Sequence, residues 1–252
     1  MTPNESAVAA FTRLDPAGTA LLFDVDGTLI DLAPGPFDVH VPDELRASLV
    51  RLLERGGGAL ALVSGRPIRD LDLLFTPLKL PAIGGHGAET RLHVGEAAER
   101  VADLPDALRS ELIAAIPPGS ALDYEDKGYS VALHFRRAPY EEERLRDHIA
   151  RVLAKYPDEA LDLLPGKAIF EIKRPGVSKG AAVRALMQRQ PFAGRTPVFI
   201  GDDVTDESVF AVMPELGGIN FSVSREFPGV SHVFAAPADV RRALAQIAAS
   251  QR

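Results

Sequence analysis

The sequence contains no cysteine and no tryptophan among its 252 residues. Without cysteine, the chain can form neither a disulfide bond nor a thiolate-bound zinc site. Its apolar runs are all shorter than the roughly 20 residues that a membrane-spanning helix requires. The first residues also lack the basic and then apolar pattern of a secretory signal. We therefore expect a soluble cytoplasmic protein without a membrane partner.

Positive charge is also scarce. Lysine and arginine total 28 residues against 35 acidic ones, so the formal net charge is -7 at pH 7. A nucleic-acid-binding protein needs a basic excess to neutralise phosphates, so neither DNA nor RNA is expected as a partner. The apolar content of 46% and the charged content of 25% are ordinary for a globular protein. The length allows one large domain or two modest ones.

An apolar run followed by two aspartates is the feature around which the chain is organised. Residues 19–23 predict a buried strand, and Asp24 and Asp26 follow it with one residue between them. Side chains two apart on a strand point the same way, and open α/β sheets bind ligands at the carboxyl ends of their strands. Two adjacent carboxylates repel each other unless a cation shares their site. The pattern therefore predicts a site for a hard divalent metal such as Mg²⁺.

An Asp-x-Asp-Gly run can also belong to other structures. A calcium-binding loop needs a glutamate at its twelfth position, but counting from Asp24 that position is Gly35. This excludes the calcium loop. A plain turn remains the alternative when the segment is considered by itself.

Strand and helix patterns alternate in the first and last thirds of the chain. Short apolar runs predict further strands at residues 59–63, 81–84, 196–200 and 219–223. Apolar residues at helical spacing predict helices beginning near Asp43 and Pro67, and others over 178–190 and 238–249. This alternation is typical of a Rossmann-like α/β fold with a parallel sheet.

The middle of the chain has a different pattern. Helices are predicted over 105–116 and 140–156, and strands over 121–126, 129–136, 160–164 and 168–173. Hairpin connections replace crossovers here, which indicates a small α+β domain inserted into the larger one. We therefore expect a core at residues 1–104 and 179–252, and an inserted domain at 105–178.

Groups suited to phosphate chemistry stand at the ends of four predicted elements. Asp24 and Asp26 end the first strand. Ser64 ends the second, where its hydroxyl and the N–H groups of a helix start can bind phosphate oxygens. Lys179 opens a later helix, and its ammonium can reach a phosphate. Asp202 ends a late strand and could complete the oxygen shell of a metal.

This ordered set resembles the haloacid-dehalogenase-like phosphatases. Some members of that superfamily carry an α/β cap between the second and third of these motifs, where the inserted domain falls in this chain. Further segments resemble the trehalose-6-phosphate phosphatase family, and the resemblance covers most of residues 20–212. These segments are residues 64–66, 85–89, 125–127, 134–136, 170–173 and 201–207.

The resemblance implies a covalent mechanism with Mg²⁺ as cofactor. Asp24 would be the nucleophile, and Asp26 would act first as general acid and then as general base. Lys179 and Ser64 would complete the catalytic set. The metal would be held by the side chains of Asp24 and Asp202 and by the backbone carbonyl of Asp26.

Other residues are assigned supporting roles by the same resemblance. Asp203 and Asp206 are expected to position Lys179 and metal-bound water instead of contacting the metal. Thr28 is expected to hold Asp24 and Asp26 in place. The residues expected to bind substrate are Ser64, Gly65, Arg66, His86, Glu125, Lys127, His134, Arg136 and Glu171. A structural role is the alternative for His86, and a solvated surface charge is the alternative for each residue of the inserted domain.

The activity that the resemblance implies is Mg²⁺-dependent hydrolysis of trehalose 6-phosphate to trehalose and phosphate. A phosphatase for another sugar phosphate, such as a sucrose or glucosyl-glycerate phosphate, would share the core and differ only in the cap. A non-catalytic sugar-phosphate sensor would lack a nucleophile, an acid or a metal ligand, yet all three are present. A phosphomutase would have to protect the same intermediate from water. Besides the sugar phosphate, a trehalose-phosphate synthase of the same pathway is the partner that we expect.

Overall fold

A computed structural model describes residues 2–33, 38–166 and 168–250. The chain forms two compact units, one of Met1–Arg100 with Ser178–Arg252 and one of Val101–Val177. The sequence places these boundaries after residues 104 and 178 instead. Leu104 belongs to the second unit because it is buried in that unit's core and its N–H donates to the carbonyl of Gly128 at 2.9 Å.

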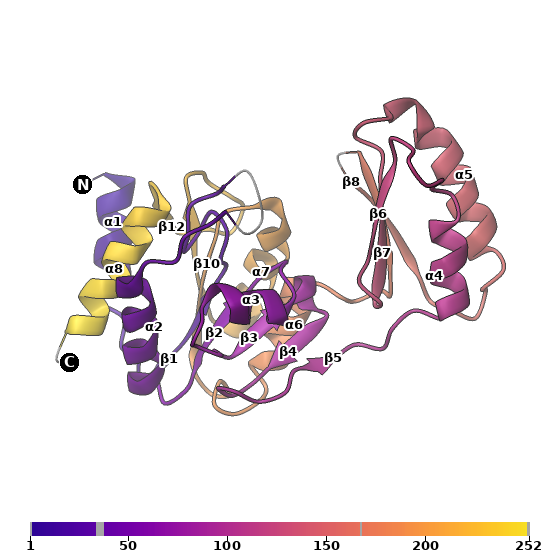
Figure 1. Cartoon of the computed structure of the whole chain (residues 1–252). Helices are drawn as coiled ribbons and strands as arrows, with labels where there is room; N and C mark the ends of the chain where they lie inside the picture. Colours follow the sequence, from indigo (N-terminus) through magenta and orange to yellow (C-terminus); the bar gives the residue numbers. More distant parts are fainter. Residues whose placement is uncertain (1, 34–37, 167, 251–252) are drawn as a thin grey trace. The chain divides into compact units, whose positions relative to one another are not determined.

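The first unit contains a sheet of eight strands and six helices of the α type among its described residues (Figure 1). Its elements are α1 (Pro3–Phe11), β1 (Thr19–Phe23), α2 (Asp43–Arg55), β2 (Leu60–Val63), α3 (Ile68–Leu74), β3 (Ala82–Gly84), β4 (Glu89–Arg91), β5 (Glu99–Arg100), α6 (Lys179–Leu186), β10 (Thr196–Gly201), α7 (Glu207–Val212), β11 (Ile219–Val223), β12 (His232–Phe234) and α8 (Pro237–Ala249).

The strand order is β12-β11-β10-β1-β2-β3-β4-β5. Neighbours from β12 to β3 are parallel, which confirms the predicted parallel sheet, while β4 and β5 extend it as antiparallel strands. The sequence does not predict β4, β5 or β12, and it wrongly makes β11 the last strand. These three strands are two or three residues long, too short to carry a periodic pattern.

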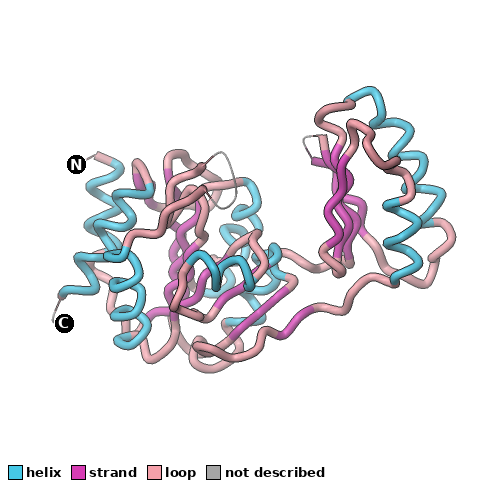
Figure 2. The backbone as a smooth tube through the Cα atoms, viewed as in Figure 1, coloured by secondary structure: helices cyan, strands magenta, loops and turns pink. Residues whose placement is uncertain are grey.

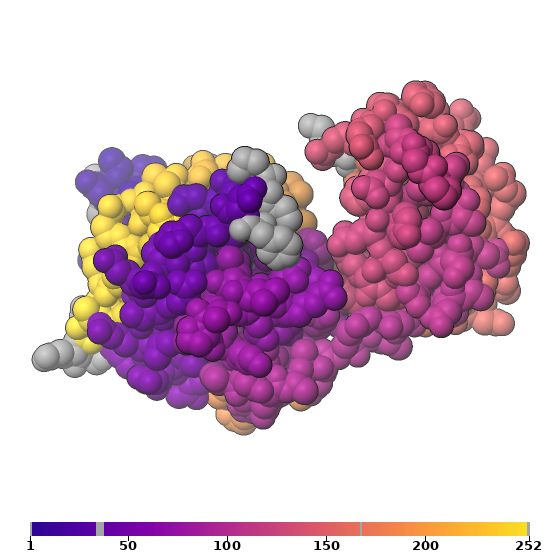
Figure 3. Space-filling model, viewed as in Figure 1, coloured from indigo at the N-terminus to yellow at the C-terminus, as the bar shows by residue number. Residues whose placement is uncertain are grey.

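Helices cover both faces of this sheet, as the apolar strands require. Leu21 and Phe23 of β1 share a buried cluster with residues of α1, α2, α3 and α8. Ala20 and Leu22, which alternate with them, share the opposite cluster with residues of α6 and α7. The C-terminal helix α8, yellow in Figure 3, packs against the indigo and purple N-terminal elements. The central strands are therefore fully buried, and functional groups are placed where those strands end.

The second unit has the predicted α+β architecture, with strands (magenta) and helices (cyan) in Figure 2. Its sheet is antiparallel and has the order β6-β7-β9-β8. Its elements are α4 (Asp106–Ile113), β6 (Asp123–Asp126), β7 (Ser130–His134), α5 (Glu142–Leu153), β8 (Asp162–Gly166) and β9 (Ile169–Lys173). Val131, Leu133, Phe170 and Ile172 pack with the leucines of α4 and α5. The side chains between them in sequence point to the other face of the sheet.

None of the helices among the described residues is both long and apolar enough to cross a membrane.

Candidate active site

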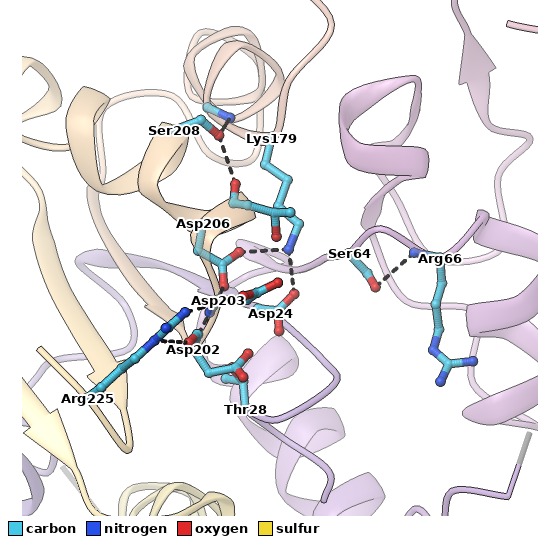
Figure 4. A network of polar contacts seen from close by, with 12 residues as sticks. Asp24, Thr28, Ser64, Arg66, Lys179, Asp202, Asp203, Asp206, Ser208 and Arg225 are labelled. Carbon is cyan, nitrogen blue, oxygen red and sulfur yellow. Dashed lines mark hydrogen bonds and ion pairs between the residues drawn. The ribbon is translucent and has the colours of Figure 1, made fainter. Parts of the chain in front are cut away.

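The end of β1 places Asp24 in a buried position beside β10. The N–H of Asp24 continues the sheet by donating to the carbonyl of Ile200 at 2.9 Å. Asp24 is only 5% exposed, and its Oδ1 accepts a hydrogen bond from Lys179 Nζ at 2.7 Å (Figure 4). Burial raises the pKa of Asp24 well above its usual range, and Lys179 opposes this shift.

Lys179 is the first residue of α6 and is 3% exposed. Ser178 begins this helix by accepting a hydrogen bond from the N–H of Ala181, which fixes where Lys179 emerges. Besides Asp24, the ammonium donates to Asp206 Oδ1 at 2.7 Å. Burial lowers the pKa of Lys179, but the two carboxylates outweigh it, so this pKa lies above its ordinary value. The side chain therefore carries a positive charge at neutral pH.

Asp206 orders the loop that follows β10. It is fully buried, and its Oδ2 accepts hydrogen bonds from the N–H groups of Asp202 at 3.0 Å and Asp203 at 3.1 Å. With Oδ1 bound to Lys179, both oxygens of Asp206 already have protein donors. Asp203 points toward solvent, where its Oδ1 accepts from Arg225 at 3.3 Å. The arrangement suits Asp206 to positioning its neighbours.

Carboxylate oxygens of Asp24, Asp202 and Asp206 lie within 4.8 Å of one another. Burial, together with the nearby charge of Asp206, raises the pKa of Asp202 to about 6. Crowded carboxylates with raised pKa values are the situation that a bound divalent cation relieves, and oxygen donors are those that Mg²⁺ prefers. The residues present therefore fit the predicted metal.

The position of Asp202 depends on two residues of the loop after β1. Thr28 Oγ1 donates to Asp202 Oδ1 at 3.2 Å, which corrects the expectation that Thr28 holds Asp24 and Asp26. Gly27 has a φ of 77°, and a Cβ there would lie 2.2 Å from Asp202 Oδ2. A side chain at this position would displace Asp202.

The side chain of Asp26 is held by Arg66. Arg66 Nε donates to Asp26 Oδ2 and Nη2 donates to Oδ1, both at 2.7 Å. The sequence expects this carboxylate to be available for proton transfer, whereas both of its oxygens are occupied here. This hydrogen bonding raises the pKa of Arg66 despite its partial burial. Asp26 must give up at least one of these bonds before it can donate a proton.

Ser64 follows β2 and is 1% exposed. Its Oγ accepts the N–H of Arg66 at 3.1 Å, so its hydroxyl hydrogen is available for an incoming oxygen (Figure 4). The next residue, Gly65, lies against His86, because a Cβ there would be 2.4 Å from His86 Cε1. His86 has a φ of 55°, in the left-handed region. The imidazole is thus packed against the loop that carries Ser64. This packing is what a structural role of His86, the alternative to substrate binding, requires.

Four of the residues expected to bind the sugar lie together in the second unit. Glu125 and Glu171 both pair with Ala132, one from each neighbouring strand, on the face away from α4 and α5. His134 shares this face because it is two residues beyond Ala132. Lys127 Nζ lies 3.4 Å from Glu125 Oε2 and 4.0 Å from Glu171 Oε1.

The fifth expected residue of this unit has a different position. Arg136 is exposed in the turn after β7, beyond the end of the sheet. Ser130, which sequence reasoning missed, belongs to the polar face instead, since its Oγ donates to Glu171 Oε1 at 3.0 Å.

In the first unit, Glu89 was also missed, although it lies in the segment 85–89 that resembles the family. Its Oε2 accepts the N–H of Ile68 at 2.6 Å.

Comparisons with known proteins identify the family of this chain. A family model described as trehalose-phosphatase matches residues 22–240. The trehalose-6-phosphate phosphatase of Escherichia coli (strain K12) is 44% identical over 210 residues, which cover 81% of this chain and 77% of that protein. The probable trehalose-phosphate phosphatase of Sinorhizobium fredii is 42% identical over 212 residues, covering 83% and 79% respectively.

Solved structures agree on the fold. The trehalose-6-phosphate phosphatase of Aspergillus fumigatus superposes with a TM-score of 0.71 at 22% identity, covering 98% of this chain and 97% of that chain. The C-terminal domain of the Candida albicans enzyme also gives 0.71, at 20% identity, covering 97% and 96%. The predicted haloacid-dehalogenase-like fold is thereby confirmed. The chain belongs to the trehalose-phosphatase family.

Proposed function

We propose that this chain hydrolyses trehalose 6-phosphate to trehalose and phosphate through an aspartyl-phosphate intermediate. The observation that carries the proposal is the buried Asp24 carboxylate, bonded to Lys179 at 2.7 Å beside Asp202 and Asp206, in a chain of this family. A nucleophilic carboxylate next to a fixed cation and a metal-binding carboxylate is suited to attack on a phosphate ester.

In the first step, an oxygen of Asp24 forms a bond to phosphorus and the bond from phosphorus to the sugar oxygen breaks. The leaving sugar oxygen takes a proton from Asp26, because an alkoxide leaves poorly without one. Lys179 has three N–H donors, two of which bind Asp24 and Asp206. The third can donate to a phosphate oxygen, and the hydroxyl of Ser64 can donate to another.

In the second step, water attacks the phosphorus of the aspartyl phosphate. Asp26, now ionised, takes a proton from this water, and the bond between phosphorus and Asp24 breaks. The two bonds from Arg66 orient the Asp26 carboxylate, and at least one of them must be released before Asp26 can carry the proton. The carboxylate of Asp24 is then regenerated and phosphate is released.

Mg²⁺ is the metal that we propose for Asp24 and Asp202, with the backbone carbonyl of Asp26 as a further ligand. When bound, it offsets the negative charge of the phosphate and of the carboxylates around it. Asp206, whose oxygens are occupied by protein donors, is assigned to orienting Lys179 and the Asp202 loop.

We propose that the second unit determines which sugar phosphate is hydrolysed. A disaccharide offers hydroxyl groups, and Glu125, Lys127 and Glu171 provide both acceptors and donors on one face of a sheet. A sugar that leaves such polar groups unpaired is strongly disfavoured. His134 and Arg136 are assigned weaker contacts. A phosphatase for another sugar phosphate would differ at these positions and not in the first unit.

The test is phosphate release from trehalose 6-phosphate by the purified protein. We expect turnover with Mg²⁺ and its loss with a chelator, restored when the metal is returned. No release under any metal condition would refute the proposed function. A cytoplasmic location and an association with a trehalose-phosphate synthase stay predictions from the sequence.

A further inference from the structure

The loop that carries Ser64 and Arg66 is bonded to the segment that follows β3. Ser64 N–H donates to the carbonyl of Ile83 at 2.9 Å, and its own carbonyl accepts the N–H of His86 at 3.1 Å. The carbonyl of Arg66 accepts the N–H of Gly85 at 2.9 Å. These backbone bonds tie the start of the loop to β3 and its extension, but they end at Arg66.

The other end of the loop is held by a side chain. Helix α3 begins at Ile68, and Pro67, which precedes it, provides no side-chain hydrogen bond to the helix. The first N–H groups of a helix need acceptors from outside it. Glu89, from the first position of β4, accepts the N–H of Ile68 on its Oε2 at 2.6 Å. Its negative charge is also favourable at the positive end of a helix.

This contact can act on the site because little chain separates the two. Ile68 is two residues beyond Arg66, and Arg66 places its guanidinium on Asp26. Pro67 restricts the backbone between them. On the inner side, Gly65 already lies against His86, so the loop cannot relax toward the imidazole. A displacement of Ile68 is therefore transmitted to Arg66 and Ser64.

We propose that Glu89 is a positioning residue for the phosphate-binding loop Ser64–Arg66. Its carboxylate anchors the start of α3 and so sets where Ser64 and Arg66 stand relative to Asp24 and Asp26. The inference rests on the proposed roles of Ser64 and Arg66 in the phosphatase reaction. Metal binding should not depend on Glu89, because Asp24 and Asp202 are placed by β1 and β10.

The test compares Glu89→Ala, Glu89→Asp and Glu89→Gln with the native protein. Alanine removes the acceptor, aspartate retracts it by one methylene, and glutamine keeps an acceptor oxygen at the same reach. Four quantities are measured: the affinity for inorganic phosphate by calorimetry with Mg²⁺, kcat/KM for trehalose 6-phosphate, the Mg²⁺ concentration for half-maximal turnover, and the melting temperature. Thr2→Ala is the matched control. Thr2 also accepts an N–H at the start of a helix, but that helix is α1, which does not carry Ser64 or Arg66.

We expect Glu89→Ala and Glu89→Asp to weaken phosphate binding about tenfold or more, with a matching fall in kcat/KM and an unchanged Mg²⁺ requirement. Glu89→Gln should stay within about threefold of the native protein, since the hydrogen bond is kept. Thr2→Ala should lower the melting temperature without changing phosphate affinity.

Three results would overturn the inference. Glu89→Ala could bind phosphate as tightly as the native protein, Glu89→Gln could be as impaired as alanine, or the Mg²⁺ requirement could rise in step with the loss of phosphate affinity. If the alanine variant does not fold, the aspartate and glutamine variants decide the question. Absence of turnover in the native protein would instead count against the proposed function, while the phosphate affinities would still test the role of Glu89.

Discussion

Arg66 donates two parallel hydrogen bonds to the carboxylate of Asp26, each 2.7 Å long. A guanidinium has only hydrogen-bond donors, so this pair of bonds requires both carboxylate oxygens of Asp26 to be acceptors. The two residues lie 40 positions apart in sequence and are brought together by adjacent parallel strands, β1 and β2. The residue proposed to transfer protons is therefore oriented by a neighbour that must partly release it during the reaction.

Replacing Arg66 by lysine should slow hydrolysis most for substrates whose leaving group must be protonated. Lysine keeps the charge but cannot form two parallel bonds, so Asp26 would lose its orientation. We expect turnover of trehalose 6-phosphate to fall about tenfold or more, and turnover of p-nitrophenyl phosphate, whose leaving group needs no proton, to fall less. Arg69→Ala, at an exposed side chain of α3, is the control. Equal losses on both esters would show that Arg66 acts on the phosphate and not through Asp26.

Replacing Asp24 by asparagine should abolish turnover. The amide has nearly the same shape but cannot form the acyl phosphate, so we expect a loss of at least about a thousandfold. Asp31→Asn, an exposed carboxylate seven positions further on that pairs with Arg241, should stay near the native rate. The measurement is single-turnover phosphate release from trehalose 6-phosphate. A near-native rate in Asp24→Asn would exclude the covalent mechanism.

Replacing Lys127 by alanine should impair recognition of the sugar and spare the phosphoryl chemistry. The change leaves Glu125 and Glu171 without the cation that lies between them. We expect kcat/KM for trehalose 6-phosphate to fall about tenfold or more, with little change for p-nitrophenyl phosphate. Lys155→Ala, at an exposed lysine of the same unit, is the control. If both substrates lose equally, Lys127 lies outside sugar recognition.

The carboxylates of the proposed metal site should lower the free energy of unfolding when no metal is bound. The raised pKa of Asp202, about 6, means that the folded protein holds this proton more tightly than the unfolded chain. Stability therefore falls as pH rises from about 4 to about 6. At pH 7.5 with chelator, Asp202→Asn should melt roughly 2–4 °C higher than the native protein.

Added Mg²⁺ should reverse this order by stabilising the native protein and not the variant. Asp31→Asn, outside the carboxylate group, should show neither effect. The expectation fails if Asp202→Asn melts lower than the native protein in chelator, because the carboxylate would then stabilise the metal-free fold.

The sequence predicts the parts of this fold that rest on patterns within one segment. β1 is recognisable because its residues after Thr19 are all apolar, and the whole strand is buried. Asp24 and Asp202 are predictable at one edge because their strands are parallel neighbours. The hairpin of β6 and β7 follows from alternation and a Lys127-Gly128 turn.

Side-chain partnerships between distant segments are not predictable in this way. Thr28 donates to Asp202, 174 positions away, although the sequence places it with its near neighbours. The bond between Glu89 and Ile68 and the grip of Arg66 on Asp26 depend on rotamers that packing selects. Motif residues could thus be identified from the sequence, but the contacts that orient them required the structure.

Selective hydrolysis of trehalose 6-phosphate is tested most directly by kcat/KM for phosphate release across a panel of sugar phosphates at saturating Mg²⁺. The panel holds trehalose 6-phosphate, sucrose 6-phosphate, a glucosyl-glycerate phosphate and glucose 6-phosphate. We predict that kcat/KM for trehalose 6-phosphate exceeds that for each of the others by about a hundredfold or more, because a wrong sugar would leave the polar groups of the second unit unpaired. Comparable values for several unrelated sugar phosphates would contradict it.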